Sequence, residues 1–173
     1  TLCIYNPLNK KEIITKSKIK PKIKFSKKKV NFINVGRFTD QKDQITLLKA
    51  INLLKGKINF NLLIVGYGKQ RNLLLNYIND NNLQKKVKIV PYQTNPYSLI
   101  KSSDIFILTS LYEGLPNVLL AAQVLKKFII SSNCPTGPRE ILLNGKAGYL
   151  FKIKDYKKLS KLIGWNCIQR RNF

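Results

Sequence analysis

Leu111-Tyr-Glu-Gly-Leu-Pro-Asn-Val-Leu-Leu120 comes shortly after the apolar run Ile105 to Leu108, and Pro116 within it begins a second apolar segment. This pattern predicts a strand, a tight turn that carries Glu113, and a helix with proline in its first turn, where the missing N–H costs nothing. The free N–H groups of such a helix end, with the helix dipole behind them, favour a phosphate. A carboxylate at the same turn can accept hydrogen bonds from sugar hydroxyls. The stretch therefore contains both parts that a nucleotide-sugar site needs.

The rest of the chain alternates between strand-like and helix-like patterns. We predict strands over residues 30–35, 61–65, 87–90, 105–108, 128–131 and 148–150. Helical periodicity lies between them, over residues 45–54, 73–78, 115–124 and 157–163. Such alternation predicts an α/β fold with a parallel sheet covered by helices on both faces, in which ligands bind at the carboxyl ends of the strands. Gly36, Gly66 and Glu113 each follow a predicted strand, and so we expect them at one edge of the sheet.

Two segments carry a family resemblance: Ser110-Leu-Tyr-Glu-Gly-Leu-Pro-Asn-Val-Leu-Leu120 and Cys134-Pro-Thr-Gly-Pro-Arg-Glu-Ile-Leu142. They resemble the donor-binding half of a retaining, metal-independent glycosyltransferase of the GT-B fold, family 4. Further matches run in the expected order from about residue 30 to about residue 150. The resemblance implies a Rossmann-like parallel sheet with helices on both faces, the C-terminal half of such an enzyme.

The family has two glutamates separated by seven residues. Glu113 matches the first, whose implied role is contact with the donor sugar. The second, which would hold the ribose hydroxyls, corresponds to Ala121 in this chain. A methyl group cannot accept those hydrogen bonds, and the loss costs roughly 1.5–3 kcal/mol of binding energy. The fold prediction does not depend on this position, but full activity does.

Gly36-Arg37 ends the first strong strand and Lys42 opens the next helix. Gly36 lets the backbone approach a ligand, and two positive charges at a strand–helix turn suit a diphosphate. By spacing alone, a solvated basic pair is the commoner outcome in a chain so rich in lysine. The resemblance implies that Arg37 and Lys42 neutralise the leaving diphosphate of the donor, so that no metal or other cofactor is needed. The chain has no histidine and few carboxylates, and so it offers no metal site.

The other donor-binding candidates rest on the resemblance. Gly66-Tyr-Gly68 has the beginning of a dinucleotide-binding pattern, but the third glycine is missing, and a tight turn in the cleft wall is the better interpretation. Tyr92 lies in the segment that lines the nucleobase pocket in the family. Thr136 is a predicted N-cap, with Arg139 in the first helical turn after it. The remaining candidates lie in two turns. Gly114, Leu115 and Asn117 belong to the turn and helix start that would bind phosphate, and Gly137 and Arg139 belong to the loop that the resemblance assigns to the donor-sugar pocket.

Length and composition are those of one globular domain: 173 residues, of which 44% are hydrophobic. No apolar run approaches the roughly 20 residues that span a bilayer, and no signal-peptide pattern begins the chain. The chain has no methionine and begins at Thr1, so we expect a fragment or a processed piece. Cys3, Cys134 and Cys167 are odd in number and lack metal-type spacing, which favours a reduced, cytoplasmic protein.

The net charge of +24 comes mostly from lysine. The first interpretation is that the source proteome is rich in lysine and that these lysines lie on solvated surfaces. The second is that the charge attracts the protein to an anionic membrane surface. The second would make the protein peripheral on the inner face of the membrane. A nucleic-acid partner is not expected, because aromatic residues are not interleaved with the lysines as single-strand binders require.

We predict three parts of the chain: an interdomain linker and basic loop over 1–29, a nucleotide-sugar-binding domain over 30–163, and a tail of uncertain structure over 164–173. The lysine-rich stretch 10–29 lacks a sustained apolar face and contains Pro21, which favours linker or loop. After residue 163 the family pattern fails. The tail is either an aberrant end or a divergent start of a closing helix.

The resemblance implies transfer of a sugar from a nucleoside diphosphate donor, often UDP-linked, to a glycan or lipid-linked acceptor in bacterial surface polysaccharide assembly, with the anomeric configuration retained. In the family the acceptor site lies largely in the N-terminal GT-B domain, which this chain lacks. We therefore expect the chain alone to be inactive in transfer. Two alternatives stay open: a degenerate or truncated non-catalytic remnant, and a basic module that binds anionic surfaces.

Overall fold

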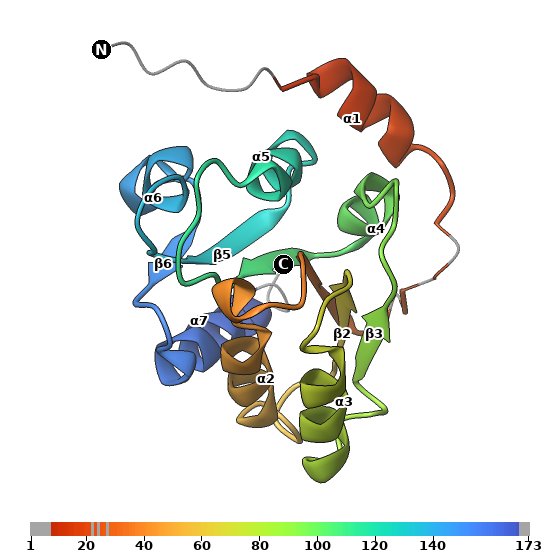
Figure 1. Ribbon diagram of the computed structural model, residues 1–173, viewed down its shortest axis with the longest axis vertical. Helices are drawn as coiled ribbons and strands as arrows, with labels where there is room; N and C mark the ends of the chain where they lie inside the picture. Colours follow the sequence, from red (N-terminus) through yellow and green to blue (C-terminus); the bar gives the residue numbers. More distant parts are fainter. Residues whose placement is uncertain (1–7, 22, 24, 27, 170–173) are drawn as a thin grey trace.

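A computed structural model describes residues 8–169 apart from 22, 24 and 27. Its centre is one six-stranded sheet in the order β3-β2-β1-β4-β5-β6, in which every strand pair is parallel (Figure 1). The strands are β1 Val30–Val35, β2 Phe60–Val65, β3 Val87–Val90, β4 Ile105–Leu108, β5 Phe128–Ser132 and β6 Tyr149–Phe151. The predicted α/β fold is confirmed, and no strand boundary differs from its prediction by more than one residue.

Helices cover both faces of the sheet, as Figure 1 shows. They are α2 Gln44–Asn52, α3 Arg71–Asp80, α4 Tyr97–Ser102, α5 Asn117–Val124, α6 Pro138–Ile141 and α7 Tyr156–Gln169, with short 3₁₀ turns at Asp40–Lys42 and Leu143–Gly145. Apolar residues of α2, α3 and α7 form one buried cluster, and those of α4 and α5 form the other. The strands between are apolar on both faces, and all four residues of β4 are buried. This double burial explains why the strands read as continuous apolar runs.

The loop predicted over 10–29 is wrong for its first part, because Lys10–Ser17 forms helix α1. The side chain of Asn9 caps this helix by accepting a hydrogen bond from the backbone N–H of Glu12 at 3.0 Å. Only Ile13 and Ser17 are buried on α1, which packs against α4 and α5. Because α1 buries only two residues, its sequence has no repeating apolar face, and hydrophobic periodicity therefore does not predict this helix.

The boundary predicted at residue 164 falls inside a helix, which agrees with the second of the two interpretations of the tail. Helix α7 continues through Gly164 to Gln169, and Asn166 and Cys167 are buried on it. The ring of Trp165 lies 5.5 Å from that of Tyr149, centroid to centroid. These residues have modest helix propensity, and packing against the domain decides their structure. Residues 1–7 and 170–173, which belong to the predicted linker and tail, lie outside the described residues.

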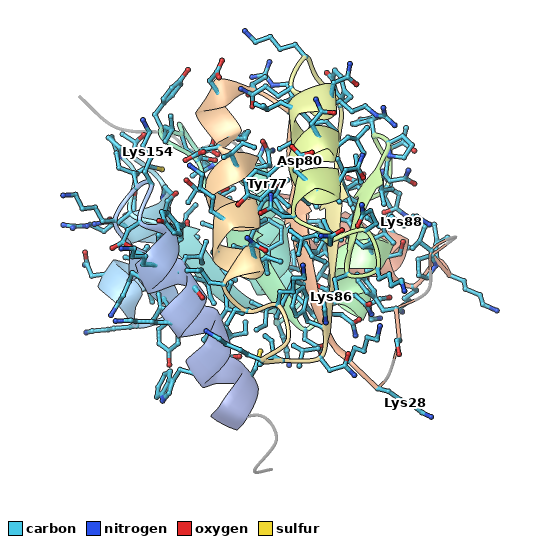
Figure 2. The ribbon with its side chains drawn as sticks, turned by 90° about the horizontal axis from the view of Figure 1, so that it is seen from below. Lys28, Tyr77, Asp80, Lys86, Lys88 and Lys154 are labelled. Carbon is cyan, nitrogen blue, oxygen red and sulfur yellow. The ribbon has the colours of Figure 1, made fainter. Side chains whose placement is uncertain are left out.

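Lysines lie on more than one side of the domain. Figure 2 shows Lys154 on the opposite side from Lys28 and Lys88. The ammonium of Lys86 lies 4.8 Å from the ring centroid of Phe60, a cation–π contact at the amino end of β2. Within the described part of the chain, no helix combines the length and the apolar character that crossing a bilayer requires. Association with an anionic membrane surface stays a prediction.

The direction in which the chain adds strands reverses between β1 and β4. After β1 the chain adds β2 and β3 on one side, and then returns to place β4 on the other side. The loops that follow β1 and β4 therefore leave the sheet edge in opposite directions. In α/β sheets of this type, the ligand-binding crevice lies at the carboxyl ends of the strands beside such a reversal.

Two adjacent leucines on α3 give a matched test of this packing. Leu74 is fully buried, whereas Leu73 is 51% exposed. Leu74→Ala should lower the free energy of unfolding by about 2–5 kcal/mol, because it removes buried methyl groups and leaves a cavity. Leu73→Ala should change it by less than about 0.5 kcal/mol. Urea unfolding followed by circular dichroism measures both, and equal losses would mean that α3 is packed in another register.

Candidate functional site

Lys42 and Glu113 meet across the crevice. The Nζ atom of Lys42 lies 2.5 Å from Oε1 of Glu113, and the side chains are only 14% and 6% exposed. The hydroxyl of Ser110 donates to the same Oε1 atom at 2.6 Å. The sequence prediction placed both charged residues at the donor site without pairing them. Asp43, the neighbour of Lys42 in the sequence, caps α2 by accepting a hydrogen bond from the backbone N–H of Thr46 at 3.3 Å.

The loops around this ion pair are tied together by hydrogen bonds. The backbone N–H of Leu111 donates to the carbonyl of Gln41 at 2.8 Å, and the side-chain amide of Gln41 donates to the carbonyl of Tyr112 at 3.0 Å. The hydroxyl of Thr109 donates to the carbonyl of Lys42 at 2.9 Å. These contacts join the loop after β4 to the turn after β1. The ion pair is therefore held by backbone on both sides of the crevice.

The segment after β5 closes the turn that carries Glu113. Gly137 has φ +79°, and a Cβ atom there would lie 2.5 Å from the carbonyl oxygen of Gly114 and 2.6 Å from Cδ of Pro116. The prediction that Thr136 caps α6 is wrong, because the N-cap residue is Gly137. The hydroxyl of Thr136 instead donates to the backbone carbonyl of Glu113. The turn that carries Glu113 and the turn at Gly137, which were predicted to bind the phosphate and the sugar, are therefore in direct contact.

The amino end of α5 opens beside this turn. Gly114 and Asn117 are exposed and Leu115 is half-buried, while Pro116 occupies the N-cap position. The first N–H groups of a helix have no partner within the helix and carry the positive end of its dipole. This end of α5 can therefore accept an anion next to the Lys42–Glu113 pair.

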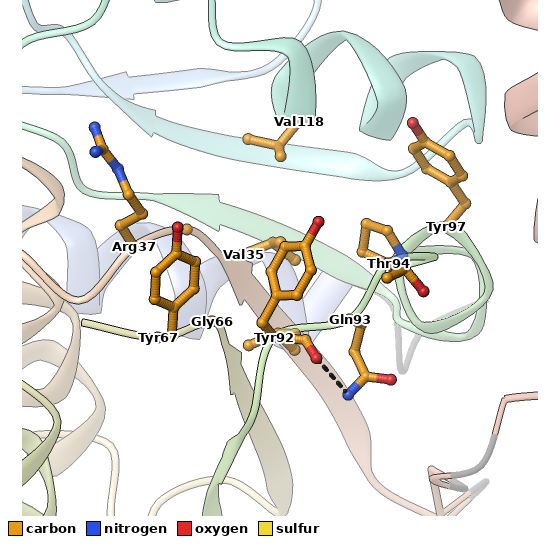
Figure 3. Close-up of a pocket in the computed structure, with 12 residues that line it drawn as sticks. Val35, Arg37, Gly66, Tyr67, Tyr92, Gln93, Thr94, Tyr97 and Val118 are labelled. Carbon is orange, nitrogen blue, oxygen red and sulfur yellow. Dashed lines mark hydrogen bonds between the residues drawn. The ribbon is translucent and has the colours of Figure 1, made fainter.

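A cavity of about 360 Å³ lies at the carboxyl ends of β1, β2 and β3 (Figure 3). This volume is in the range of small-molecule sites. Four predicted donor-binding residues line it: Gly36, Arg37, Gly66 and Tyr92. The rings of Tyr67 and Tyr92 stand edge to face at its rim, with centroids 5.7 Å apart. Both rings are more than half exposed, and so an apolar or aromatic group of a ligand can pack against them.

Gly66 allows the backbone of this cavity to close against Gly36. A Cβ atom on Gly66 would run into the carbonyl oxygen of Gly36. A Cβ atom on Gly36 would lie 3.5 Å from the methylene groups of Lys42. Because the stem of Lys42 packs on Gly36, the ion pair and the cavity share one wall. The amide of Gln44 supports this wall by donating to the carbonyl of Arg37 at 2.9 Å.

Ala121 and Arg139 are among the predicted residues that do not line the cavity. Ala121 is only 2% exposed and does not line it. Arg139 is exposed, and its Nε donates to Oδ1 of Asn133 at 3.1 Å. Tyr67, Tyr97, Val118 and Ser110 also lie at the site and were not among the predicted site residues, although Tyr67 belongs to the turn that was predicted to form the cleft wall. Tyr67 and Ser110 each follow a predicted strand closely, and that position was a signal that could have found them.

No group of three or more potential metal ligands occurs within the part of the chain that the structure describes. Cys134 is buried close to the ion pair. Burial raises the pKa of its thiol, and the nearby Glu113 carboxylate raises it further, while a hydrogen bond with Ser132 opposes the shift. The thiol is therefore protonated at neutral pH and is a poor nucleophile.

The sequence model of the family "Glycosyl transferases group 1" matches residues 15–166. The chain belongs to this family. An uncharacterized glycosyltransferase of Methanocaldococcus jannaschii is 44% identical over 112 residues, which cover 64% of this chain and 28% of that protein. The Escherichia coli UDP-Gal:alpha-D-GlcNAc-diphosphoundecaprenol alpha-1,3-galactosyltransferase is 33% identical, and the match covers 72% of this chain and 33% of that one.

Solved glycosyltransferases share the fold. Anabaena HepE in complex with UDP-glucose superposes with a TM-score of 0.75 at 21% identity, covering 83% of this group 1 chain and 40% of HepE. The predicted resemblance to one half of a GT-B glycosyltransferase is thereby confirmed. The chain spans about a third of the length of the curated relatives it matches.

The buried ion pair can be compared with an exposed one. Lys42→Met should lower the free energy of unfolding by about 3 kcal/mol, because it leaves the buried carboxylate of Glu113 without its counter-charge. Lys69→Met removes a lysine that is 78% exposed and 3.7 Å from Asp40, and it should cost less than about 1 kcal/mol. Chemical denaturation measures both values. Equal losses would show that the Lys42–Glu113 pair contributes no more than a surface pair.

Gly137→Ala tests the contact between the two turns. Gly56 is a matched control, since its φ of +82° is close to the +79° of Gly137 and its Cβ would meet nothing within 4 Å. Both substitutions place a Cβ atom on a residue with a positive φ, which introduces backbone strain at each position. Gly137→Ala should cost about 1–3 kcal/mol more, since its Cβ displaces Gly114 and Pro116. The difference in urea midpoints gives the extra cost, and its absence would contradict the contact.

Proposed function

We propose that this domain binds a UDP-sugar as the donor for a retaining transfer to a glycan or lipid-linked acceptor in surface polysaccharide assembly. The observation that carries the proposal is the cavity at the strand-order reversal, which shares a wall with the Lys42–Glu113 pair and lies next to the amino end of α5. The names of its relatives support the donor and the acceptor class. Besides the E. coli enzyme, CapH, a capsular polysaccharide biosynthesis glycosyltransferase of Staphylococcus aureus, is 38% identical over 63% of this chain.

In this proposal the donor is divided among three regions of the site. The uracil packs in the cavity against the rings of Tyr67 and Tyr92. The diphosphate extends toward Arg37, Lys42 and the N–H groups at the start of α5. Arginine and a helix amino terminus both stabilise phosphate oxygens, and they would also stabilise the charge that develops on the departing nucleotide. This positive surface supports donor binding without a metal.

Glu113 is oriented to hold the sugar. Its Oε1 atom accepts hydrogen bonds from both Lys42 and Ser110. Its Oε2 atom has no hydrogen-bond partner among the described residues, and so it is available to a sugar hydroxyl. Because Oε1 is fixed at two points, the carboxylate loses little conformational freedom when the sugar binds. The ammonium of Lys42 has three N–H donors, and it can contact a phosphate oxygen while it keeps its bond to Glu113.

The acceptor is bound elsewhere in this proposal. Since the chain spans about a third of its curated relatives, the residues that hold the acceptor belong to the part of such proteins that these 173 residues do not contain. A complete transfer reaction then requires both parts.

A non-catalytic remnant is the second candidate. It is favoured by Ala121, which is buried and offers no acceptor group to the ribose. The two candidates differ in nucleotide binding, because a remnant has no need to keep a working cavity.

Calorimetric titration with UDP and GDP separates the two candidates. The unmodified chain should bind UDP in preference to GDP. Ala121→Glu should tighten UDP binding about 10- to 100-fold, because a carboxylate there accepts hydrogen bonds from the ribose. Thermal melting must accompany the titration, because position 121 is 2% exposed and a larger side chain has to reach the cavity to avoid strain. Binding by neither form, with both folded, would support the remnant.

A further inference from the structure

On α5 the cavity is lined by the apolar Val118, whereas the family resemblance implies a carboxylate at position 121 of this helix. Val118 lines the cavity, and residue 121 lies one turn later on the same face of α5. Helical side chains lean toward the amino end of their helix, and so a long side chain at 121 would extend over Val118 toward the cavity. Ala121 ends at its Cβ atom. A ribose in the cavity therefore needs another partner on this side.

Tyr97 supplies a polar group to the same region. It is the first residue of α4, it is half-buried, and it lines the cavity together with Val118. Helices α4 and α5 pack against each other. In Figure 3 the ring of Tyr97 extends from α4 toward α5, and its hydroxyl lies at the end nearer to that helix. The phenol therefore faces the wall that contains Val118 and leads to Ala121.

The hydroxyl of Tyr97 is available to a ligand. It makes no hydrogen bond to any residue that the structure describes. Lys16 interacts electrostatically with Tyr97, but its ammonium lies 2.5 Å from the carboxylate of Glu12 on its own helix. Another polar side chain of the cavity, Gln93, already has partners. The amide of Gln93 donates to the carbonyls of its own loop, at 3.0 and 3.1 Å.

We propose that the hydroxyl of Tyr97 binds the ribose hydroxyls of the nucleotide, in the role that a carboxylate at position 121 performs in relatives of this fold. A phenol can both donate and accept a hydrogen bond, and so it can satisfy either ribose hydroxyl. Tyr97 is thus a specificity-determining residue that distinguishes a ribonucleotide from a nucleotide without these hydroxyls. The assignment rests on the proposed function, since it requires a nucleotide in the cavity.

The test compares UDP with 2′,3′-dideoxy-UDP in calorimetric titrations of the unmodified chain and of Tyr97→Phe, which keeps the ring and removes one oxygen. The unmodified chain should prefer UDP. Tyr97→Phe should weaken UDP binding about 2- to 10-fold, the value of one neutral hydrogen bond, and leave dideoxy-UDP binding unchanged. Tyr92→Phe is the matched control: it removes a hydroxyl from the rim of the same cavity, and it should affect both nucleotides equally.

Ala121→Glu in the Tyr97→Phe background adds a second measurement. The restored carboxylate should recover the preference for UDP. An equal loss of both nucleotides in Tyr97→Phe, or an unchanged preference for UDP, would overturn the role of Tyr97 and leave the proposed function standing. If the unmodified chain binds UDP and dideoxy-UDP equally, the ribose hydroxyls are unbound and the inference fails alone. If it binds neither nucleotide, the proposed function fails as well.

Discussion

The reversal of strand order between β1 and β4 is the constraint on which the rest of this domain depends. Six parallel strands, covered on both faces, can expose their connecting loops only at the two ends of the sheet. At the carboxyl end, the reversal separates the loops of one half from those of the other. Both the cavity and the Lys42–Glu113 pair lie at this separation. Short loops on strand ends are enough to build the site, and no inserted subdomain is needed.

The two halves of the crevice are joined by a charge interaction that is largely removed from water. Lys42 comes from the turn after β1 and Glu113 from the turn after β4, and the surrounding hydrogen bonds run mostly from side chains to backbone. A contact of this kind fixes the relative position of two loops more strictly than apolar packing does, because hydrogen bonds are directional. The same carboxylate can then serve as structure through one oxygen and as ligand contact through the other.

The strands were predictable because each is a short apolar run, and a run of that length between helical segments is typical of a strand buried on both faces. Helices α1 and the end of α7 were not predictable, since Ile13 and Cys167 gain their stability from tertiary contacts that no local pattern reports. The charged residues at the site, Lys42 and Glu113, could be predicted from the sequence motifs that contain them. The pairing of Lys42 with Glu113, the bond from Thr136 to the carbonyl of Glu113 and the orientation of Tyr97 depend on how distant loops meet, and a single sequence does not contain that information.

Helix α1 gives the cavity a mechanical connection to the beginning of the chain. The side chain of Asn95 donates to the carbonyl of Lys16 at the end of α1, and it also accepts from the backbone N–H of Tyr97. One amide thus bridges α1 and the first residue of α4. A displacement of α1 would act on the cavity wall at Tyr97 through these two hydrogen bonds. The position of α1 is thereby linked to the wall of the cavity by side-chain and backbone contacts that do not involve the sheet.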